Sequence, residues 1–206
     1  MTDVRARGRH SSARLQSVAL ASVSPRRRSL LETLGLEVVI VASSYDEREV
    51  AGRRIDPIEL VQTHALGKAL AAAPGGPPVL VAADTAVAID GEVLGKPKDV
   101  RAARAMLARL AGRTHTVHTG FAVIDRRTQR RESGVESARV TFLPASDDEI
   151  ARYVATGEPL DKAGAYGIQG RGALFVASIA GDFYTVMGLP LARLGRAFAS
   201  LGYELL

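Results

Sequence analysis

Apolar runs of strand length alternate with longer periodic segments of helix length along most of the chain. Strands are expected where short apolar runs lie between turn residues, and helices where a capping residue or a proline precedes a longer amphipathic segment. The expected strands are residues 17–21, 37–41, 79–83, 114–124, 133–143 and 174–179. The expected helices are residues 26–34, 56–73, 99–111, 146–156 and 190–201.

Turn and capping residues mark several of these boundaries. Ser24-Pro25 and Asp56-Pro57 each place a capping side chain before a proline at the first helical position. The segment 146–149 (Ser-Asp-Asp-Glu) has the spacing of a capping box, and Asp90-Gly91 is a two-residue hairpin signal. Strands that alternate with helices, with longer antiparallel segments in the middle of the chain, predict an α/β fold with a mixed sheet flanked by helices.

The composition is that of a globular protein. The chain has 206 residues, 47% hydrophobic and 24% charged, which is enough for one domain or two closely joined lobes. The chain has no cysteine, which excludes disulfides, thiolate metal sites and a cysteine nucleophile. The absence of cysteine is compatible with a reducing compartment. No apolar run approaches the roughly 20 residues needed to span a bilayer. We therefore expect a cytoplasmic protein with no membrane partner.

The net charge of +5 is concentrated near the N-terminus. Residues 1–28 hold seven arginines against Asp3, so they carry +6 and the remaining 178 residues carry −1. A nucleic-acid-binding fold usually spreads its basic charge over a face, so this distribution argues against a stable nucleic-acid partner. Residues 1–16 lack apolar periodicity, and we expect a flexible basic arm there, followed by a single domain over residues 17–206.

Asp84 is the first candidate for chemistry, because the apolar strand 79–83 delivers it at its end. A short Val-Ala-Ile strand and the Asp90-Gly91 turn are expected to bring Lys96 back beside it. A carboxylate that faces an ammonium near a strand end suits acid–base chemistry or a metal-and-phosphate site. Pairs of this kind are also common as solvated surface pairs, so the assignment depends on other polar segments.

Three arginines, Arg26, Arg27 and Arg28, occupy the first turn of an expected helix, directly after a serine-rich turn that contains Ser22. The N-terminal end of a helix carries free N–H groups and a positive dipole, which disfavour cations unless an anion compensates them. The segment therefore indicates a bound phosphate or paired carboxylates, with a solvated basic helix start as the alternative. Its spacing is not that of a Walker A loop.

A second polar segment is Asp46-Glu47, just beyond an expected strand, with Lys68 on the following helix. Carboxylates beside phosphate-binding arginines suit a hard divalent cation, which takes oxygen ligands, although an exposed acidic loop has the same appearance. The histidines His64, His115 and His118 match no zinc-binding spacing. We interpret all three as structural or peripheral.

The third polar segment, residues 161–172, is rich in glycine. Its glycines permit positive φ and close approach of the backbone to a ligand. Gln169 offers a donor and an acceptor that can read the edge of a base or a sugar, while Tyr166 is interpreted as a packing residue. The serine-nucleophile pattern G-x-S-x-G is absent from the sequence.

Taken together, these segments resemble the Maf-type nucleoside triphosphate pyrophosphatases. The matching motifs are Ala-Ser-Val-Ser-Pro-Arg-Arg (21–27), Ala-Asp-Thr (83–85) with Gly-Lys-Pro (95–97), Gly-x-x-His-x-Val-x-Thr-Gly (112–120), Asp-Lys-Ala-Gly-Ala-Tyr-Gly-Ile-Gln-Gly (161–170) and Gly-Asp-Phe-Tyr-Thr-Val-Met-Gly-Leu-Pro (181–190). They follow the family's order over about residues 17–202. The resemblance implies a mixed sheet between two lobes, related to the inosine triphosphatase architecture, with an active cleft between the lobes.

The resemblance also implies an activity: hydrolysis of a nucleoside triphosphate to the monophosphate and pyrophosphate, with Mg²⁺ or Mn²⁺. By position, Asp84 matches the family's proton acceptor. Arg26, Thr85 and Gln169 match the residues that distinguish the branch acting on dTTP and UTP. Asp84 and Glu47 are the expected metal ligands, and a homodimer is a family-based expectation. Further active-site polar groups of the family fall on Ser22, Arg27, Glu47, Lys68 and Lys96.

Two alternatives to a dTTP/UTP pyrophosphatase stay open on the sequence. One is the sister branch of the family, which acts on 7-methyl-GTP and looks different in the third polar segment. The other is a nucleotide-binding regulator of growth or septation that does not turn its ligand over. Asp84 beside a cationic set argues against the regulator, since a sensor does not need a proton acceptor there.

Overall fold

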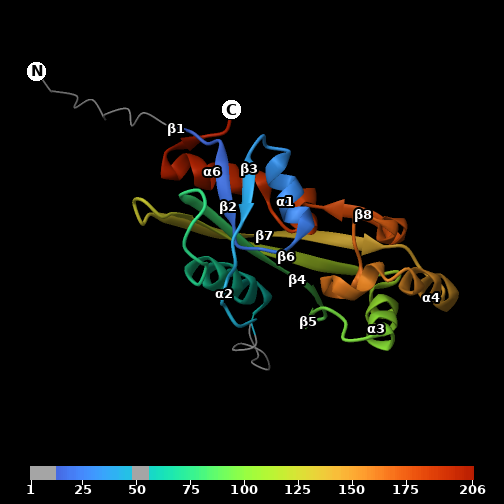
Figure 1. Ribbon diagram of the computed structural model, residues 1–206. Coiled ribbons are helices and arrows are strands. Elements are labelled where there is room, and N and C mark those ends of the chain that lie inside the picture. Colours follow the sequence, from blue (N-terminus) through green and yellow to red (C-terminus); the bar gives the residue numbers. More distant parts are fainter. Residues whose placement is uncertain (1–12, 48–55) are drawn as a thin grey trace, which may run out of the picture.

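The computed structural model describes residues 13–47 and 56–206 (Figure 1). They form a seven-stranded mixed sheet of order β3-β2-β4-β6-β7-β8, with β5 also paired to β4, and a separate two-stranded pair, β1-β9. The strands are β1 (Ala13–Arg14), β2 (Ser17–Leu20), β3 (Glu37–Ile40), β4 (Val79–Ile89), β5 (Glu92–Leu94), β6 (Thr114–Asp125), β7 (Arg131–Phe142), β8 (Val176–Ala180) and β9 (Tyr203–Glu204). The helices are α1 (Pro25–Glu32), α2 (Pro57–Leu70), α3 (Val100–Leu110), α4 (Asp147–Ala155), α5 (Phe183–Met187) and α6 (Leu191–Leu201), with 3₁₀ helices η2 (Glu158–Asp161), η3 (Ala163–Ala165) and η4 (Arg171–Phe175). No helix in these residues has the length and apolarity needed to cross a membrane.

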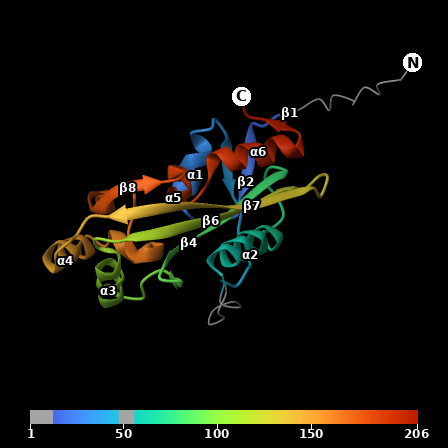
Figure 2. The same ribbon diagram turned by 180° about the vertical axis from the view of Figure 1, so that it is seen from behind.

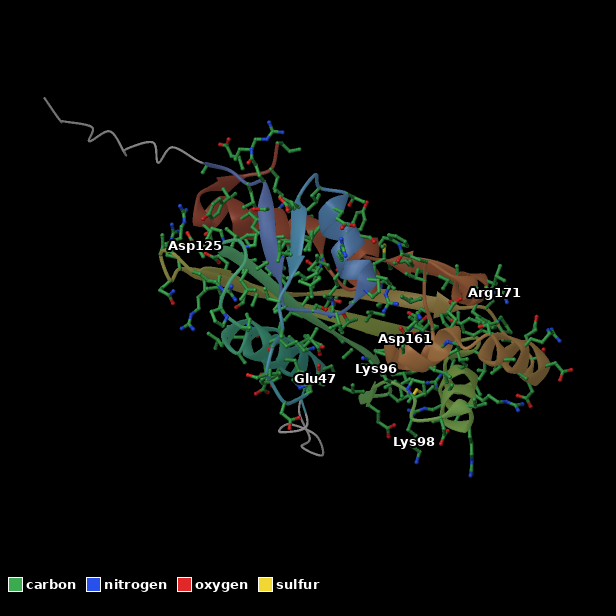
Figure 3. All side chains as sticks on the ribbon, viewed as in Figure 1. Glu47, Lys96, Lys98, Asp125, Asp161 and Arg171 are labelled. Carbon is green, nitrogen blue, oxygen red and sulfur yellow. The ribbon has the colours of Figure 1, made fainter. Side chains whose placement is uncertain are left out.

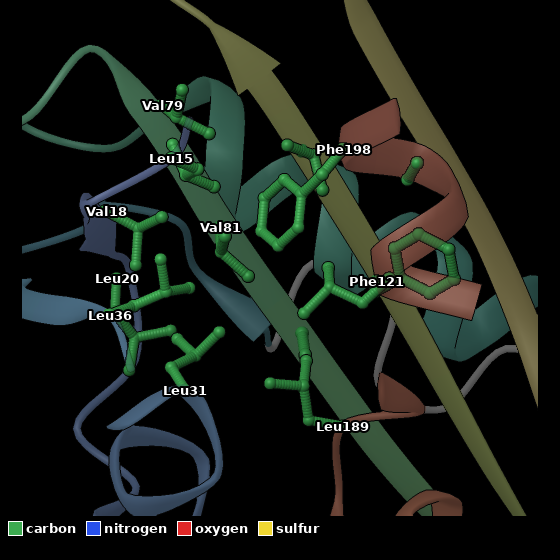
Figure 4. Packing of buried hydrophobic residues seen from close by; sticks show 14 of the residues in the cluster. Leu15, Val18, Leu20, Leu31, Leu36, Val79, Val81, Phe121, Leu189 and Phe198 are labelled. Atoms are coloured by element: carbon green, nitrogen blue, oxygen red, sulfur yellow. The ribbon is translucent and has the colours of Figure 1, made fainter. Parts of the chain in front are cut away.

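Helices cover both faces of the sheet, as Figures 1 and 2 show from opposite sides. Helix α2 packs against β4 and β6 on one face, while α1 and α6 lie on the other face and α3 and α4 lie together at one end. One core cluster includes Val81, Phe121 and Phe198 and fills the space between the sheet, α1 and α6 (Figure 4). A second cluster, which includes Leu107 and Phe142, joins α3 and α4 to the other end of the sheet. The expected α/β fold with a mixed sheet flanked by helices is confirmed.

Strand β4 organises the sheet because its two edges are paired differently. One edge pairs antiparallel with β6 over residues 79–88. The other edge pairs parallel with β2 at residues 80–81 and antiparallel with β5 at residues 87–89. Asp84 and Thr85 lie between these two pairings, in the middle of an 11-residue strand. The prediction that this strand ends before Asp84 is wrong, because the apolar positions resume after the polar pair and keep the ladder with β6 intact.

Gly120 on β6 allows α2 to lie close to the sheet. A Cβ atom at this position would collide with the backbone of Val61 and Gln62 in α2. Gly120 also pairs with Asp84 across the β4–β6 ladder, so the close approach occurs beside that carboxylate. A strand glycine at such a contact brings the side chains of α2 within reach of Asp84.

Most of the expected elements are present, with boundaries shifted by a few residues. The capping box at Ser146 makes both of its hydrogen bonds, and the Asp90-Gly91 pair has positive φ at both residues, as a two-residue hairpin requires. Ser24 occupies the N-cap of α1, but its side chain makes no capping bond. The last expected strand begins at Val176 rather than two residues earlier, because η4 precedes it.

The chain joins the fold before residue 17, where we expected the domain to begin. Ala13 and Arg14 pair in parallel with the strand 203–204, and Leu15 is buried in the first core cluster. The expectation that the arm extends to residue 16 is therefore wrong, because a partner strand from the C-terminus and one apolar side chain hold this segment. The rest of the expected arm, residues 1–12, lies outside the described residues.

Candidate functional site

A cavity of about 680 Å³ opens beside the middle of β4, a size typical of small-molecule sites. Its walls come from the loop between β2 and α1, the segment after β3, helix α2, the turn after β5 and the segment that follows η2. Of the nine predicted site residues, eight line this cavity: Ser22, Arg26, Arg27, Glu47, Lys68, Asp84, Thr85 and Lys96. The ninth, Gln169, lines an adjoining cavity of about 300 Å³, to which Arg26 also contributes. In Figure 3, Glu47 lies beside α2, and Lys96 and Asp161 lie farther along the sheet, on the side of α3.

Asp84 is held by two side chains of α2. The ammonium Nζ of Lys68 lies 2.6 Å from Asp84 Oδ1 and 2.7 Å from Glu47 Oε1. On the other oxygen, His64 Nδ1 lies 3.0 Å from Asp84 Oδ2. The side chains of Lys68 and Asp84 are 14% and 16% exposed, whereas that of Glu47 is 55% exposed. The three charges thus form one group that opens to solvent on the Glu47 side.

The surroundings of Asp84 keep it ionised. Burial would raise the pKa of this carboxyl, but the hydrogen bond from His64 and the charges of Lys68 and Arg27 outweigh burial and lower the pKa to about 2. Each carboxylate oxygen accepts one hydrogen bond in this group and retains a further acceptor position. Asp84 is therefore an ionised carboxylate at neutral pH, with acceptor positions left for a ligand.

His64 is the site residue that sequence reasoning missed. We expected it to be structural or peripheral, but it lies in the cavity wall and is bonded to Asp84. Its Nε2 is buried and, among the described residues, has no hydrogen-bond partner. The available signal was its position four residues before Lys68, which places both side chains on one face of a helix. His115 and His118 are bonded instead to Tyr166 and Ser137.

Arg27 ties three segments together from the opposite side of β4. Its guanidinium donates to the carbonyl of Gly188 at 2.9 Å, to Ser22 Oγ at 3.1 Å and to Thr85 Oγ1 at 3.0 Å. Burial lowers the pKa of Arg27, while the charge of Asp84 opposes that shift. We had assigned Arg27 to an anion, and the structure shows that the protein itself already uses three of its donor nitrogens.

The hydroxyl of Thr85 belongs to the same network. Thr119 donates to the carbonyl of Thr185 at 2.8 Å, and Thr119 Oγ1 lies 3.0 Å from Thr85 Oγ1. Since the proton of Thr119 is directed to the carbonyl, Thr85 donates to Thr119 and accepts from Arg27. Ser22 Oγ accepts from both Arg27 and the backbone N–H of Ser24, and its own proton has no acceptor among the described residues, so it can be donated to a ligand in the cavity.

The remaining cations near the cavity differ in how they are paired. Arg28 does not line the cavity and forms an exposed ion pair with Glu32 on its own helix. Lys162 lines the cavity and pairs with Asp161 at 2.6 Å. The side chains of Arg26 and Lys96 also line the cavity and make no hydrogen bond or salt bridge to any other described residue. The β5 hairpin does return Lys96 to this cavity, but the ammonium bonded to Asp84 is that of Lys68, because α2 lies directly over this part of β4.

Glu47, His64 and Asp84 could together hold a metal ion. Their ligand atoms lie within 4.8 Å of one another, and two of the three side chains offer the carboxylate oxygens that hard divalent cations prefer. The ammonium of Lys68 lies against both carboxylates, which shows that this position attracts positive charge. The donor set therefore fits a divalent cation such as Mg²⁺ or Mn²⁺.

The glycine-rich third segment forms the wall between the two cavities. It folds as a series of 3₁₀ turns rather than as an open loop. Tyr166 is buried and its hydroxyl lies 2.9 Å from His115 Nε2, as expected of a packing residue. Gln169 is exposed toward the smaller cavity, and its side chain makes no hydrogen bond to any other described residue.

Comparisons with known proteins agree with this geometry. The family model described as "Maf-like protein" matches residues 17–201. A protein of Moorella thermoacetica named dTTP/UTP pyrophosphatase is 51% identical over 92% of this chain and 97% of its own length. Proteins of the same name from Symbiobacterium thermophilum and Bacillus velezensis are 47% and 49% identical, over 93% and 86% of this chain and 97% and 93% of their own lengths.

Proposed function

The chain belongs to the family of Maf-like proteins, and on that premise we propose that it hydrolyses dTTP and UTP to the nucleoside monophosphate and pyrophosphate. The observation that carries the proposal is the arrangement of the larger cavity, where the ionised carboxylate of Asp84 lies in a wall that also contributes five cationic side chains. This combination suits attack of water on a phosphate anhydride, and the relatives that share most of the chain's length carry the corresponding name.

The triphosphate is bound by the cations of the cavity. The side chains of Arg26 and Lys96 make no hydrogen bond or salt bridge to another described residue and can receive phosphate oxygens, while Lys68 already contacts Asp84 at one end of the group. Ser22 can donate its hydroxyl proton to a phosphate oxygen. Most of the catalytic benefit in phosphoryl transfer comes from positioning and from stabilising negative charge, and these residues supply both.

Asp84 acts as the general base. The oxygen of water forms a bond to the α-phosphorus, its proton passes to Asp84, and the bond from the α-phosphorus to the bridging oxygen breaks. Negative charge develops on the departing pyrophosphate, where the neighbouring cations stabilise it. His64 and Lys68 hold the two oxygens of Asp84 through separate bonds, so the carboxylate is oriented before substrate arrives.

A divalent cation, Mg²⁺ or Mn²⁺, would be held by Glu47 and Asp84. When bound it supplies charge neutralisation on the phosphate oxygens. Glu47 is the more exposed of the two carboxylates, which allows it to change partner between Lys68 and a cation.

Discrimination between bases is assigned to Arg26, Thr85 and Gln169. Gln169 offers the only unpaired amide among the described residues that line the smaller cavity, and an amide can match the donor and acceptor of a uracil or thymine edge. Arg26 lines both cavities and can link the phosphate end to the base end. Thr85 acts through Arg27, because its hydroxyl is engaged by Arg27 and Thr119.

The test is a panel of triphosphates incubated with the purified full-length protein and Mg²⁺ or Mn²⁺. UTP and dTTP are expected to yield monophosphate and pyrophosphate, while ATP, GTP and 7-methyl-GTP react poorly. Release of diphosphate and orthophosphate would contradict attack at the α-phosphorus. A preference for 7-methyl-GTP would place the chain in the sister branch, and tight binding of UTP without turnover would support a nucleotide-binding regulator.

A further inference from the structure

The carboxylate of Glu158 holds the segment that carries Gln169. Its Oε2 accepts the backbone N–H of Arg171 at 3.0 Å, and its Oε1 accepts the backbone N–H of Gly172 at 3.1 Å. Burial would raise the pKa of Glu158, but these two bonds, the Tyr153 hydroxyl and the charge of Lys162 together lower it. The carboxylate is thus ionised and committed to the backbone at the start of η4.

Tyr153 of α4 completes this anchor from the interior. Its hydroxyl donates to Glu158 Oε1 at 2.9 Å and accepts the backbone N–H of Gly167 at 3.2 Å. The Tyr153 side chain is buried, and its ring contacts that of Phe175 edge-on with centroids 5.2 Å apart. Tyr153 and Glu158 therefore grip the backbone on both sides of Gln169, at residues 167 and 171–172.

The backbone of this segment fits closely against its two anchors. A Cβ atom at Gly170 would lie 2.5 Å from the Glu158 carboxylate. A Cβ atom at Gly172 would lie 2.6 Å from the Tyr153 hydroxyl and 2.7 Å from the carbonyl oxygen of Gly167. These positions accept glycine because the anchors occupy the space that a side chain would need.

We propose that Tyr153 and Glu158 are positioning residues for base discrimination, which fix the amide of Gln169 at the smaller cavity by holding the backbone on either side of it. This inference rests on the proposed function in one respect, the assignment of Gln169 to the base. Five of the residues that line the smaller cavity lie in η2 or in the segment that follows it, including Glu158 and Gln169. Small displacements of the held backbone would therefore change the shape of that cavity directly.

A direct role of Glu158 is the competing explanation, because its side chain also lines the smaller cavity. Tyr153 separates the two explanations: it lines neither cavity. An effect of Tyr153 on the choice of base must therefore pass through the segment that it holds. The decisive substitution is Tyr153→Phe, which removes one hydroxyl and keeps the buried ring.

Tyr203→Phe is a matched control. Tyr203 is also buried, and its hydroxyl donates to Asp125 Oδ2 at 2.9 Å and accepts from Arg127 Nη2 at 2.8 Å. It lines neither cavity. Both variants lose a hydroxyl that makes two hydrogen bonds, so a general loss of stability affects them alike.

The experiment measures kcat/KM for UTP and for ATP in the wild type and both variants, with melting curves and amide hydrogen exchange of peptides that cover residues 166–173. In Tyr153→Phe the UTP-to-ATP ratio is expected to fall by about threefold to tenfold, mainly through a higher KM for UTP, and exchange at residues 167 and 171–172 should accelerate. Tyr203→Phe should keep the wild-type ratio and the wild-type exchange in these peptides.

A Tyr153→Phe protein that melts normally and keeps the wild-type ratio overturns the proposal, and so does an equal fall of the ratio in both variants. If Tyr153→Phe does not fold, Glu158→Gln is measured in the same way: faster exchange at residues 171–172 with a lower ratio supports the proposal, and unchanged exchange overturns it. If the wild type does not hydrolyse UTP, the proposed function fails by itself. In that case the equilibrium affinities for UTP and ATP are compared in the wild type and both variants. Tyr153→Phe should still lower the ratio of the two affinities, and Tyr203→Phe should not.

Discussion

Replacing Asp84 by asparagine removes one negative charge from the centre of the cavity and changes the size of the side chain very little. If Asp84 is the general base, the amide cannot take the proton of the attacking water, and kcat should fall by about 10²–10⁴-fold. His64 can still donate to the amide oxygen, so the orientation of residue 84 is retained. KM for UTP should change much less than kcat, because the cations that bind the triphosphate stay in place.

The same substitution has a cost in stability that follows from Lys68. In the wild type its ammonium lies 2.6 Å from Asp84 and 2.7 Å from Glu47, and its side chain is only 14% exposed. In Asp84→Asn the nearest remaining carboxylate is that of Glu47, which is 55% exposed and screened by solvent. The loss of a charged partner at a largely buried site is worth about 1–3 kcal/mol, or about 3–10 °C in Tm for a domain of this size.

A second substitution separates the two effects. Asp84→Asn with Lys68→Met removes both charges, so the melting temperature should return toward the wild-type value while kcat stays low. Asp90→Asn is the matched control outside the cavity, since Asp90 forms an exposed pair with Arg113 at 2.6 Å. That control should change the melting temperature much less than Asp84→Asn does and leave kcat unchanged, because exposed ion pairs are screened by solvent.

The assays are steady-state release of pyrophosphate from UTP and thermal denaturation of each variant. An Asp84→Asn protein that is folded and turns over UTP within about threefold of the wild-type rate would refute the role as general base. Glu47, the other carboxylate that contacts Lys68, would then be the candidate for the general base. A melting temperature that the second substitution does not raise would refute the account of Lys68.

Three further outcomes are expected. Gly120→Ala should lower the free energy of unfolding by about 2–3 kcal/mol, because its methyl group collides with the backbone of α2, and unchanged urea denaturation would contradict that. Burial lowers the pKa of His115 to about 4. Below about pH 6.5, the ordinary pKa of a histidine, His115 is therefore protonated in the unfolded chain and stays neutral in the folded chain. The free energy of unfolding should fall by about 2 kcal/mol from pH 7 to pH 5, and by less in His115→Phe. A chain that begins at residue 17 should unfold more easily, by about 2 kcal/mol, than one that begins at residue 13, because it lacks Leu15 and the β1–β9 pairing; equal melting temperatures would contradict this.

Local signals predicted most of the elements because each depends on neighbouring residues. The capping box at Ser146 and the Asp90-Gly91 turn are read within four residues, and the structure shows both. The β1–β9 pair could not be read in this way, since two short strands separated by almost the whole chain carry no shared pattern. The continuation of β4 beyond Asp84 was missed for another reason: a polar pair in a buried strand resembles a strand end when its tertiary partners are unknown.

The candidate site was predictable as a set of residues but not as a set of contacts. Motif resemblance gathered the nine site residues, and eight of them line one cavity. The partner of Asp84 was misassigned, because the hairpin suggested Lys96 while the geometry of Gly120 brings Lys68 to the carboxylate. His64 was missed because no sequence rule connects a helix histidine with a carboxylate 20 residues later. Such contacts depend on how closely a helix lies on a sheet, which a single glycine determines here.

The register of β4 against β6 separates the two tasks of the cavity. Asp84 and Thr85 are adjacent, so their side chains point to opposite faces of the sheet. Asp84 meets His64 and Lys68 of α2, whereas Thr85 meets Arg27 of α1. A shift of one residue would exchange the two faces and would also move the glycine of β6 away from α2. The positions of Asp84 on one face and of the Arg27–Thr85 hydrogen bonds on the other therefore both depend on the β4–β6 ladder. The long pairing of this ladder over residues 79–88 resists a shift of one residue.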